Sequence, residues 1–226
     1  MEELSMAVRK TNWFAIWITI AVVVVIVAVA GIVIAMNNKA TSPAETPTSS
    51  HITKDGGIVF GDSKKNTITT YIDFLCPICN QFEQAEGPTI KQQMDSGKAQ
   101  LVVQPVAILD NRTNPTGYSS RAGSAMYSVT IHDYAHAYAF MQALYANQPQ
   151  EGSAGLTDQQ IIDVAKKAGV NMTSELEKEI NANKYQKYVQ AAQLPSGATG
   201  TPTLVINGTQ IPVTLNPQTD ILPHLK

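Results

Sequence analysis

The hydrophobic positions of this chain fall into two different patterns. Residues 13–36 form an uncharged, almost wholly apolar run, and they lack the polar face that a helix at the surface of a soluble domain would show. A helix of this length rises about 1.5 Å per residue and crosses a hydrocarbon core of about 30 Å. The run is too long for a cleavable signal peptide. The pattern therefore predicts a single uncleaved transmembrane helix over residues 13–36.

The segments on either side of this run are polar. Residues 1–12 place Arg9 and Lys10 beside the membrane, so we expect a short cytoplasmic flank. Residues 37–55 are rich in Thr, Ser, Pro and Asn and show no apolar periodicity, which predicts a flexible linker. Residues 56–226 are then expected to form a domain outside the cytoplasm, held at the cell membrane by one span. Lysines in the linker balance the charges of the flank, so this orientation also depends on the cysteine chemistry below.

Within residues 56–226, runs of β-branched and aromatic residues alternate with stretches of helical periodicity. The first kind of run predicts strands at 58–60, 67–75, 99–108, 204–206 and 209–213. Pro105 indicates that the third strand lies at an edge of the sheet or ends there. Asn207-Gly208 predicts a tight hairpin between the last two strands.

Helical periodicity follows Cys79 and then dominates the region between the third strand and the hairpin. The first stretch contains Gly87-Pro88, which predicts a kink or break, and Gly97, which predicts its end. Later helices are expected at 119–132, 134–146, 158–169, from 174 onward, at 183–194 and at 217–225. Thr157 is a typical N-terminal cap for the third of these. The predicted fold class is therefore α/β, with a helical insertion at about residues 112–196.

Composition narrows the functional classes. The chain has 226 residues, a formal net charge of −2 and 15% charged residues, a balance that gives no indication of a nucleic-acid partner. Its two cysteines are Cys76 and Cys79, and a disulfide between residues this close removes little entropy from the unfolded chain. The pair is therefore better explained by chemistry than by a stabilising cross-link.

The motif Cys76-Pro77-Ile78-Cys79 follows a predicted buried strand directly and opens a helix. At a helix N-terminus, unpaired N–H groups and the helix dipole stabilise a thiolate and lower its pKa. Pro77 suits the first helical position, because its missing N–H costs no hydrogen bond there. We therefore expect Cys76 to be the exchanging nucleophile and Cys79, one turn later, to be the resolving thiol.

Other interpretations of these residues are weaker. A structural zinc site needs four ligands, and joining the cysteines to His132 and His136 requires a far longer gap than a zinc finger has. An inert structural disulfide is disfavoured by its small loop. The chain shows no nucleophile elbow, phosphate loop or dinucleotide fingerprint, so we expect neither a hydrolase nor a bound metal or organic cofactor.

Together these features resemble the DsbA-like branch of the thioredoxin superfamily. The resemblance rests on Phe74-Leu75-Cys76-Pro77-Ile78-Cys79, on the helical block and on Thr201-Pro202-Thr203 before the last strands, and it covers about residues 56–226. It implies a thioredoxin-like fold in which Pro202 is cis and packs beside the active-site disulfide, while Thr201 lines the catalytic face.

Two positions depart from the family pattern. Members often carry a buried carboxylate six residues before the first cysteine, where this chain has Thr70. The best-known oxidases have histidine where this chain has Ile78, which cannot donate a hydrogen bond to the Cys76 thiolate. The second departure predicts a milder oxidant.

Three functional hypotheses are consistent with the motif. The leading one is a dithiol oxidase that forms disulfides in exported proteins and that, by the resemblance, is reoxidised by a membrane partner of DsbB or VKOR type. The alternative is an extracytoplasmic disulfide reductase or isomerase, since the sequence does not fix the reduction potential of the pair. The third comes from a different class: a non-catalytic peptide-binding or chaperone module that keeps the fold.

Overall fold

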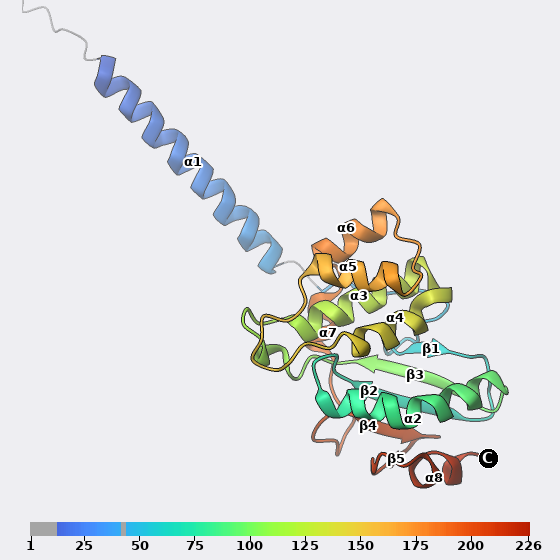
Figure 1. The fold of residues 1–226 in the computed structure, drawn as a ribbon. Helices are drawn as coiled ribbons and strands as arrows, with labels where there is room; N and C mark the ends of the chain where they lie inside the picture. The colour runs from blue at the N-terminus through green and yellow to red at the C-terminus, as the bar shows by residue number, and fades with distance from the viewer. Residues whose placement is uncertain (1–12, 42–43) are drawn as a thin grey trace, which may run out of the picture. The chain divides into compact units, whose positions relative to one another are not determined.

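The computed structural model describes residues 13–41 and 44–226, and contacts divide the chain into two units, Met1–Pro43 and Ala44–Lys226 (Figure 1). The first unit contains helix α1 (Trp13–Thr41), which begins where the apolar run begins and extends past residue 36 into the predicted linker. Among the described residues, no helix combines the length and the apolar character needed to cross a membrane. The transmembrane anchor stays a prediction, and the predicted flank 1–12 lies outside the described residues.

Residues 44–55 belong to the second unit, although their composition predicts a flexible linker. The His51 ring stacks on Tyr134 with centroids 3.4 Å apart, and a β-bridge joins Ile52 to Ile58. Each contact depends on a single residue rather than on a periodic pattern, which is why composition alone did not indicate it.

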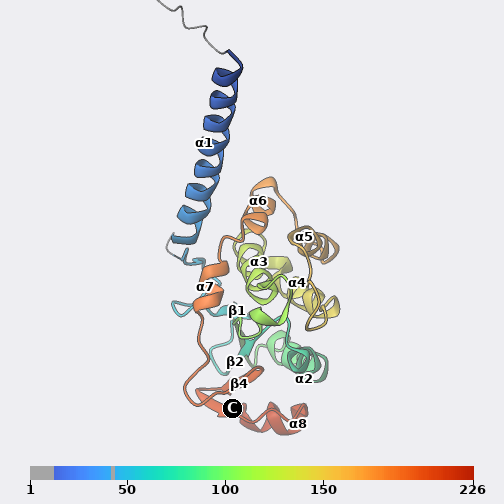
Figure 2. The same cartoon turned by 90° about the vertical axis from the view of Figure 1, so that its left-hand side faces the viewer.

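A five-stranded sheet forms the centre of the second unit (Figures 1 and 2). Its order is β1-β3-β2-β4-β5, with β1 Ile58–Phe60, β2 Thr67–Ile72, β3 Gln100–Pro105, β4 Thr203–Ile206 and β5 Thr209–Ile211. The neighbours β2 and β3 are parallel, and all other neighbours are antiparallel. Because β3 has a partner on each side, Pro105 marks the end of the strand and not an edge of the sheet.

Helix α2 (Pro77–Asp95) runs through Pro88 without interruption, so Gly87-Pro88 does not break the helix as the sequence suggested. Proline removes one backbone hydrogen bond from the helix, but Phe82 and Ile90 on the same helix are buried in the core and hold it in place. The helix ends at Asp95, and Gly97 follows with φ +66°, in agreement with the predicted stop.

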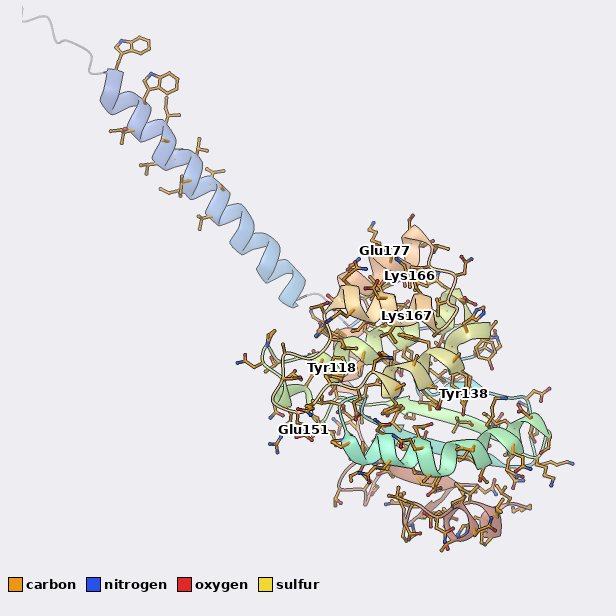
Figure 3. The ribbon with its side chains drawn as sticks, in the orientation of Figure 1. Tyr118, Tyr138, Glu151, Lys166, Lys167 and Glu177 are labelled. Atoms are coloured by element: carbon orange, nitrogen blue, oxygen red, sulfur yellow. The ribbon has the colours of Figure 1, made fainter. Side chains whose placement is uncertain are left out.

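Five helices lie between β3 and β4 in the chain and form a helical block: α3 Tyr118–His132, α4 Tyr134–Ala146, α5 Asp158–Lys167, α6 Ser174–Ala182 and α7 Gln186–Ala191. Both views show the block gathered on the β1–β3 side of the sheet, whereas α8 (Pro217–Asp220) lies at the β5 side (Figures 1 and 2). Helix α3 is central and packs against α4, α6 and α7. At the outer surface, Lys166 of α5 and Glu177 of α6 form an ion pair of 3.8 Å (Figure 3).

Local signals set several helix boundaries. The Thr157 hydroxyl accepts a hydrogen bond from the backbone N–H of Gln160 at 3.2 Å, and the Gln160 side chain accepts one from the backbone N–H of Thr157 at 2.8 Å, which is a complete capping box at the start of α5. The predicted helix at 183–194 is shorter than expected: Asn183 adopts a left-handed conformation that ends α6, and α7 begins only at Gln186.

Candidate active site

The two cysteines lie where β2 gives way to α2. Cys76 is the N-cap residue of α2, with extended backbone angles of φ −68° and ψ 116°, and Pro77 follows at the start of the helix. The Cys76 Sγ accepts a hydrogen bond from the backbone N–H of Cys79 at 3.4 Å. The sulfur therefore takes the place that a serine or threonine oxygen holds at an ordinary helix start.

The segment around Pro202 reaches the same sulfur from the far end of the chain. The Thr201–Pro202 peptide bond is cis, as the resemblance implies, and the Cys76 thiol donates to the Thr201 carbonyl oxygen at 3.4 Å. Strand β4 begins at Thr203 and pairs with β2, with Thr203 opposite Tyr71. This pairing places a loop 125 residues away in sequence against Cys76.

The surroundings of Cys76 favour its thiolate. Its pKa falls from 9.0 to about 6, mainly because the Cys79 thiol hydrogen-bonds to it, an effect that outweighs burial. Thr201 and the backbone N–H groups of Cys79 and Ile78 lower the pKa further. A thiolate that exists at neutral pH is the form that attacks disulfides and also leaves readily from them. The arrangement can therefore support thiol–disulfide exchange at Cys76.

Cys79 lies in the opposite environment. Its side chain has no exposed surface, whereas Cys76 keeps 6% of its own. Burial raises the pKa of the Cys79 thiol well above 9.0, and hydrogen bonding to Cys76 and the negative charge there raise it further. Both cysteines are free thiols in the structure, and their surroundings favour a thiolate at Cys76 and a protonated thiol at Cys79.

Asp73 supports the segment that leads into the motif. Its side chain is fully buried, and its two carboxylate oxygens accept the backbone N–H groups of Leu75 at 2.8 Å and Leu109 at 2.9 Å. Burial raises the pKa of this carboxyl. Thr70, at the position where family members often carry the carboxylate, is buried, and its hydroxyl has no hydrogen-bond partner among the described residues.

Gln148, after the end of α4, is a contact residue that the sequence did not indicate. Its side-chain N–H group donates to the carbonyl oxygens of Phe74 and Cys76, both at 3.0 Å. No motif or periodic pattern links Gln148 to Cys76, which lies 72 residues earlier. The fold alone brings them together.

The surface beside Cys76 is apolar at Ile78, which is 46% exposed. A cavity of about 340 Å³ occurs elsewhere in the same unit, and Tyr71, Tyr127 and Tyr188 contribute to its wall. Neither cysteine lines this cavity, so it is not counted as part of the site.

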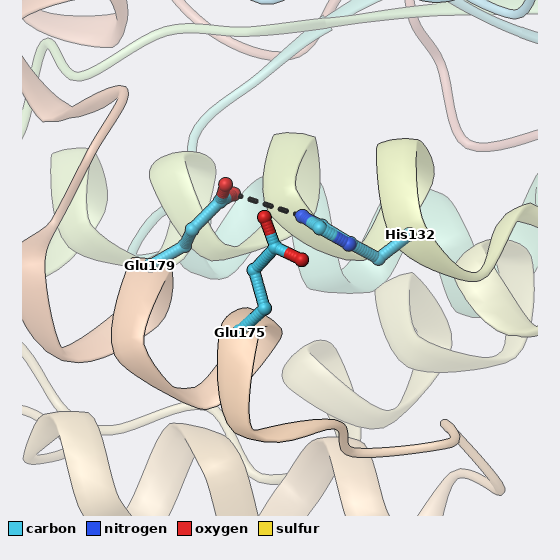
Figure 4. Close-up of side chains that lie close together, drawn as sticks. All are labelled: His132, Glu175 and Glu179. Atoms are coloured by element: carbon cyan, nitrogen blue, oxygen red, sulfur yellow. Dashed lines mark ion pairs between the residues drawn. The ribbon is translucent and has the colours of Figure 1, made fainter.

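One group of metal-ligand type occurs among the described residues, in the helical block (Figure 4). Ligand atoms of His132, Glu175 and Glu179 lie within 4.8 Å of one another. The His132 Nε2 lies 3.2 Å from Glu179 Oε2, and the Lys184 Nζ lies 2.7 Å from Glu179 Oε1, so ion pairs account for the arrangement. Both cysteines and His136 lie outside the group, so the structure does not assemble the four ligands of the zinc alternative.

Residues 53–220 match a family model described as thioredoxin. No curated protein sequence matches the chain. Among solved structures, the chain is similar to oxidized DsbA from Mycobacterium tuberculosis, with 30% sequence identity, coverage of 74% of this chain and 84% of that one, and a TM-score of 0.61. It is also similar to the reduced form of the disulfide bond oxidoreductase DsbG from Mycobacterium tuberculosis, with 30% identity, coverage of 73% and 77%, and a TM-score of 0.59.

A more distant likeness concerns the fold alone. Oxidised BdbD from Bacillus subtilis shares 20% identity with this chain, covers 74% of it and 90% of its own length, and superposes with a TM-score of 0.58. This likeness shows that the two proteins share a fold.

Proposed function

The chain belongs to the thioredoxin family and is a thiol–disulfide oxidoreductase of DsbA type, and on this premise we propose that it works as a dithiol oxidase that passes a Cys76–Cys79 disulfide to exported proteins. One observation carries the proposal: Cys76 Sγ caps the start of α2 and accepts the N–H of the fully buried Cys79 at 3.4 Å, an arrangement that lowers the pKa of Cys76 to about 6. A stabilised thiolate stabilises the reduced enzyme, and a more stable reduced form makes the disulfide a stronger oxidant.

The first chemical step transfers the disulfide to the client. A client thiolate attacks the Cys76 sulfur of the oxidised enzyme, the Cys76–Cys79 bond breaks, and a mixed disulfide forms between the client and Cys76. Cys79 leaves as a thiolate and takes up a proton, because burial raises the pKa of its thiol well above 9.0. Protonation makes Cys79 a poor nucleophile and delays its return to Cys76.

The second step releases the client in its oxidised form. The second thiolate of the client attacks the client sulfur of the mixed disulfide, and Cys76 leaves as a thiolate. A leaving thiol of low pKa departs faster, so the same hydrogen bonds that lower the pKa of Cys76 assist this step. Two electrons have then moved from the client to the enzyme, which holds two thiols.

Client contact is proposed at the apolar rim and at the cis-proline loop. Ile78 offers exposed apolar surface directly beside the reacting sulfur. At the cis-proline loop, the Thr201 carbonyl oxygen lies 3.4 Å from the same sulfur. These surfaces fit an unfolded or extended exported protein that presents cysteines.

Location and reoxidation complete the proposal. The uncharged run at residues 13–36 supports a single-pass anchor in the cell membrane with the catalytic domain outside the cytoplasm. Each cycle leaves two electrons on the enzyme, so a partner must remove them. We propose a membrane reoxidase of DsbB or VKOR type for this step, positioned beside the anchored domain.

The experiment is a redox titration combined with an oxidation assay. We expect equilibration with glutathione to give the Cys76–Cys79 pair a reduction potential above about −200 mV, which would make its disulfide more oxidising than glutathione. The oxidised protein should convert a reduced two-cysteine client to its disulfide form, and Cys76→Ser should not. Cys79→Ser cannot form its own disulfide, but its Cys76 thiolate can attack a disulfide of an exported protein, from which one client sulfur leaves as a thiolate. With the anchor present, the resulting reducible adducts should accumulate, because the intramolecular release route through Cys79 is absent.

Two outcomes would reject the oxidase. A potential near about −270 mV, as in thioredoxin, would favour the reductase alternative. Activity that survives Cys76→Ser in cells would favour a non-catalytic peptide-binding or chaperone module.

A further inference from the structure

Three backbone carbonyl groups ahead of α2 have partners at the end of α4. The Tyr145 hydroxyl donates to the carbonyl of Asp73 at 3.4 Å. The single side-chain nitrogen of Gln148 donates to the carbonyls of Phe74 and Cys76 at 3.0 Å each. Thus the segment that carries the nucleophile is held by the helical block, although the nucleophile itself belongs to the thioredoxin-like core.

The Gln148 amide makes hydrogen bonds through both its nitrogen and its oxygen. Its nitrogen supplies two N–H groups to two carbonyls, and its oxygen accepts a hydrogen bond from the Asn80 side chain at 3.3 Å. The Asn80 nitrogen also donates to the carbonyl of Tyr145 at 3.1 Å. A half-buried amide with these three bonds holds its neighbours in one orientation, because turning the amide would leave one of the bonded carbonyls without its partner.

The Cys76–Pro77 peptide is the part of this segment that most needs an external partner. Proline has no backbone N–H, so only the Cys76 carbonyl can anchor this peptide. That carbonyl receives Gln148 at 3.0 Å and the backbone N–H of Asn80 at 3.2 Å. A rotation of this peptide would turn the first turn of α2 relative to Cys76 Sγ, and with it the N–H of Cys79 that lies 3.4 Å from the sulfur.

We infer that Gln148 is a positioning residue of the reaction: its amide fixes the Phe74 and Cys76 carbonyls so that the N–H groups and the thiol of the first turn of α2 stay directed at the Cys76 sulfur. This role rests on the proposed thiol–disulfide exchange and assigns part of its tuning to the helical block. The hydrogen bonds that the structure gives to the Gln148 side chain go to Asn80 and to the Phe74 and Cys76 carbonyls, so its influence on the sulfur is transmitted through the backbone of Cys76.

Two replacements test the inference by different means. In Gln148→Met, the side chain keeps similar length but cannot hydrogen-bond to either carbonyl. In Gln148→Glu, an ionised carboxylate faces the two carbonyls and adds negative charge near the thiolate. We expect the acid dissociation constant of the Cys76 thiol to fall about threefold in the first variant and about tenfold in the second, measured by thiolate absorbance or by alkylation across pH.

The reduction potential of the Cys76–Cys79 pair gives a second readout. A general loss of stability would not by itself lower this potential. A tenfold change in the redox equilibrium corresponds to about 30 mV, so Gln148→Glu should be a weaker oxidant by about that amount, and Gln148→Met by about half of it. The matched control is Asn147→Ala: Asn147 carries the same amide one residue earlier, is exposed, and donates to the carbonyl of Ala143 in its own helix.

The outcomes separate this inference from the proposed function. If the wild-type protein exchanges disulfides but both Gln148 variants keep its thiol pKa and potential, the positioning role is rejected while the function stands. The role is also rejected if Asn147→Ala shifts the potential as much as the Gln148 variants. If the wild-type protein does not exchange disulfides, the proposed function fails, and the pH titration of Cys76 still decides whether Gln148 acts on the sulfur.

Discussion

The first turn of α2 stabilises a negatively charged side chain, whereas the turns that follow it favour uncharged ones. At the first turn, Cys76 is stabilised as an anion, with a pKa of about 6. Two turns later, burial raises the pKa of Glu83 to about 7, and burial together with the nearby Asp220 raises the pKa of Glu86 to about 8. One helix therefore favours an anion at its start and suppresses charge along its buried face.

The difference follows from which polar groups each turn offers. The helix start has N–H groups without partners inside the helix, and these face the Cys76 sulfur. Farther along, the N–H groups are used within the helix, and the Glu86 side chain is fully buried with no hydrogen-bond partner for either carboxyl oxygen among the described residues.

Alkylation of the reduced protein gives the largest expected effect. At pH 7, Cys76 should react at least about 100-fold faster than Cys79, because only Cys76 is largely a thiolate and keeps exposed surface. The rate at Cys76 should rise to half its maximum near pH 6. Mass spectrometry of digests after short exposure to iodoacetamide would measure both rates, and preferential labelling of Cys79 would exchange the two assigned roles.

The buried carboxyls give the next largest effect, on stability as a function of pH. Since the folded-state pKa of Glu86, about 8, exceeds its ordinary value of 4.5, the stability gained from its protonated form is fully present below pH 4.5 and is lost as pH rises through about 8. Each such group changes the free energy of unfolding by at most about 1.4 kcal/mol per pH unit. Glu86→Gln should therefore flatten the decline between pH 5 and 8.

This measurement needs a background without the reactive thiol. The pKa of Cys76 is lowered on folding, so its ionisation adds stability as pH rises above about 6 and opposes the effect of Glu86. We would therefore measure urea unfolding of Cys76→Ser and of Cys76→Ser with Glu86→Gln, because neither variant contains the opposing Cys76 thiol. The control is Glu177→Gln, since the Glu177 side chain is 41% exposed and forms an ion pair with Lys166 at the surface. Identical pH slopes with and without Glu86 would show that this carboxyl is ionised in the folded protein.

The start of α2 was readable in the sequence, whereas its surroundings were not. A β-type run, Cys76-Pro77-Ile78-Cys79 and a helical stretch are consecutive, so local rules predict a thiol at a helix start. The hairpin at Asn207-Gly208 was equally local, and both residues adopt the positive φ angles, 52° and 84°, that such a turn requires.

Contacts between distant segments were beyond local rules. Gln148 lies in a polar stretch after a helix, where its composition indicates a loop and gives no sign of two bonds to the active-site backbone. Glu86 follows a hydrophilic pattern in the sequence, yet α8 and the core bury it completely. Gly87-Pro88, which predicts a kink or break, does not break the helix, because Phe82 and Ile90 of the same helix are packed in the core.

The smallest expected effect sharpens the comparison at a second helix start. In α5 the cap is the Thr157 hydroxyl, which accepts the N–H of Gln160 at 3.2 Å, in the same geometry that Cys76 Sγ adopts at 3.4 Å toward Cys79. Thr157→Ala should lower the free energy of unfolding by about 1 kcal/mol and leave the alkylation rate of Cys76 unchanged. At this helix start the cap contributes only stability.

Replacing the cap residue of α2 should have the opposite effect, with loss of activity and not of stability. Cys76→Ser keeps a cap atom that accepts the N–H of Cys79, and an oxygen is the better acceptor, so we expect stability below about pH 6, where the Cys76 thiol is protonated, to be retained while disulfide exchange disappears. Chemical denaturation and the oxidation assay, run on both variants, would show the two losses separately. A Thr157→Ala variant that slows alkylation of Cys76 would contradict this, because it would mean that the helical block controls the thiol through its general stability. In that case the hydrogen bonds from Gln148 would not be the specific link between the block and the nucleophile.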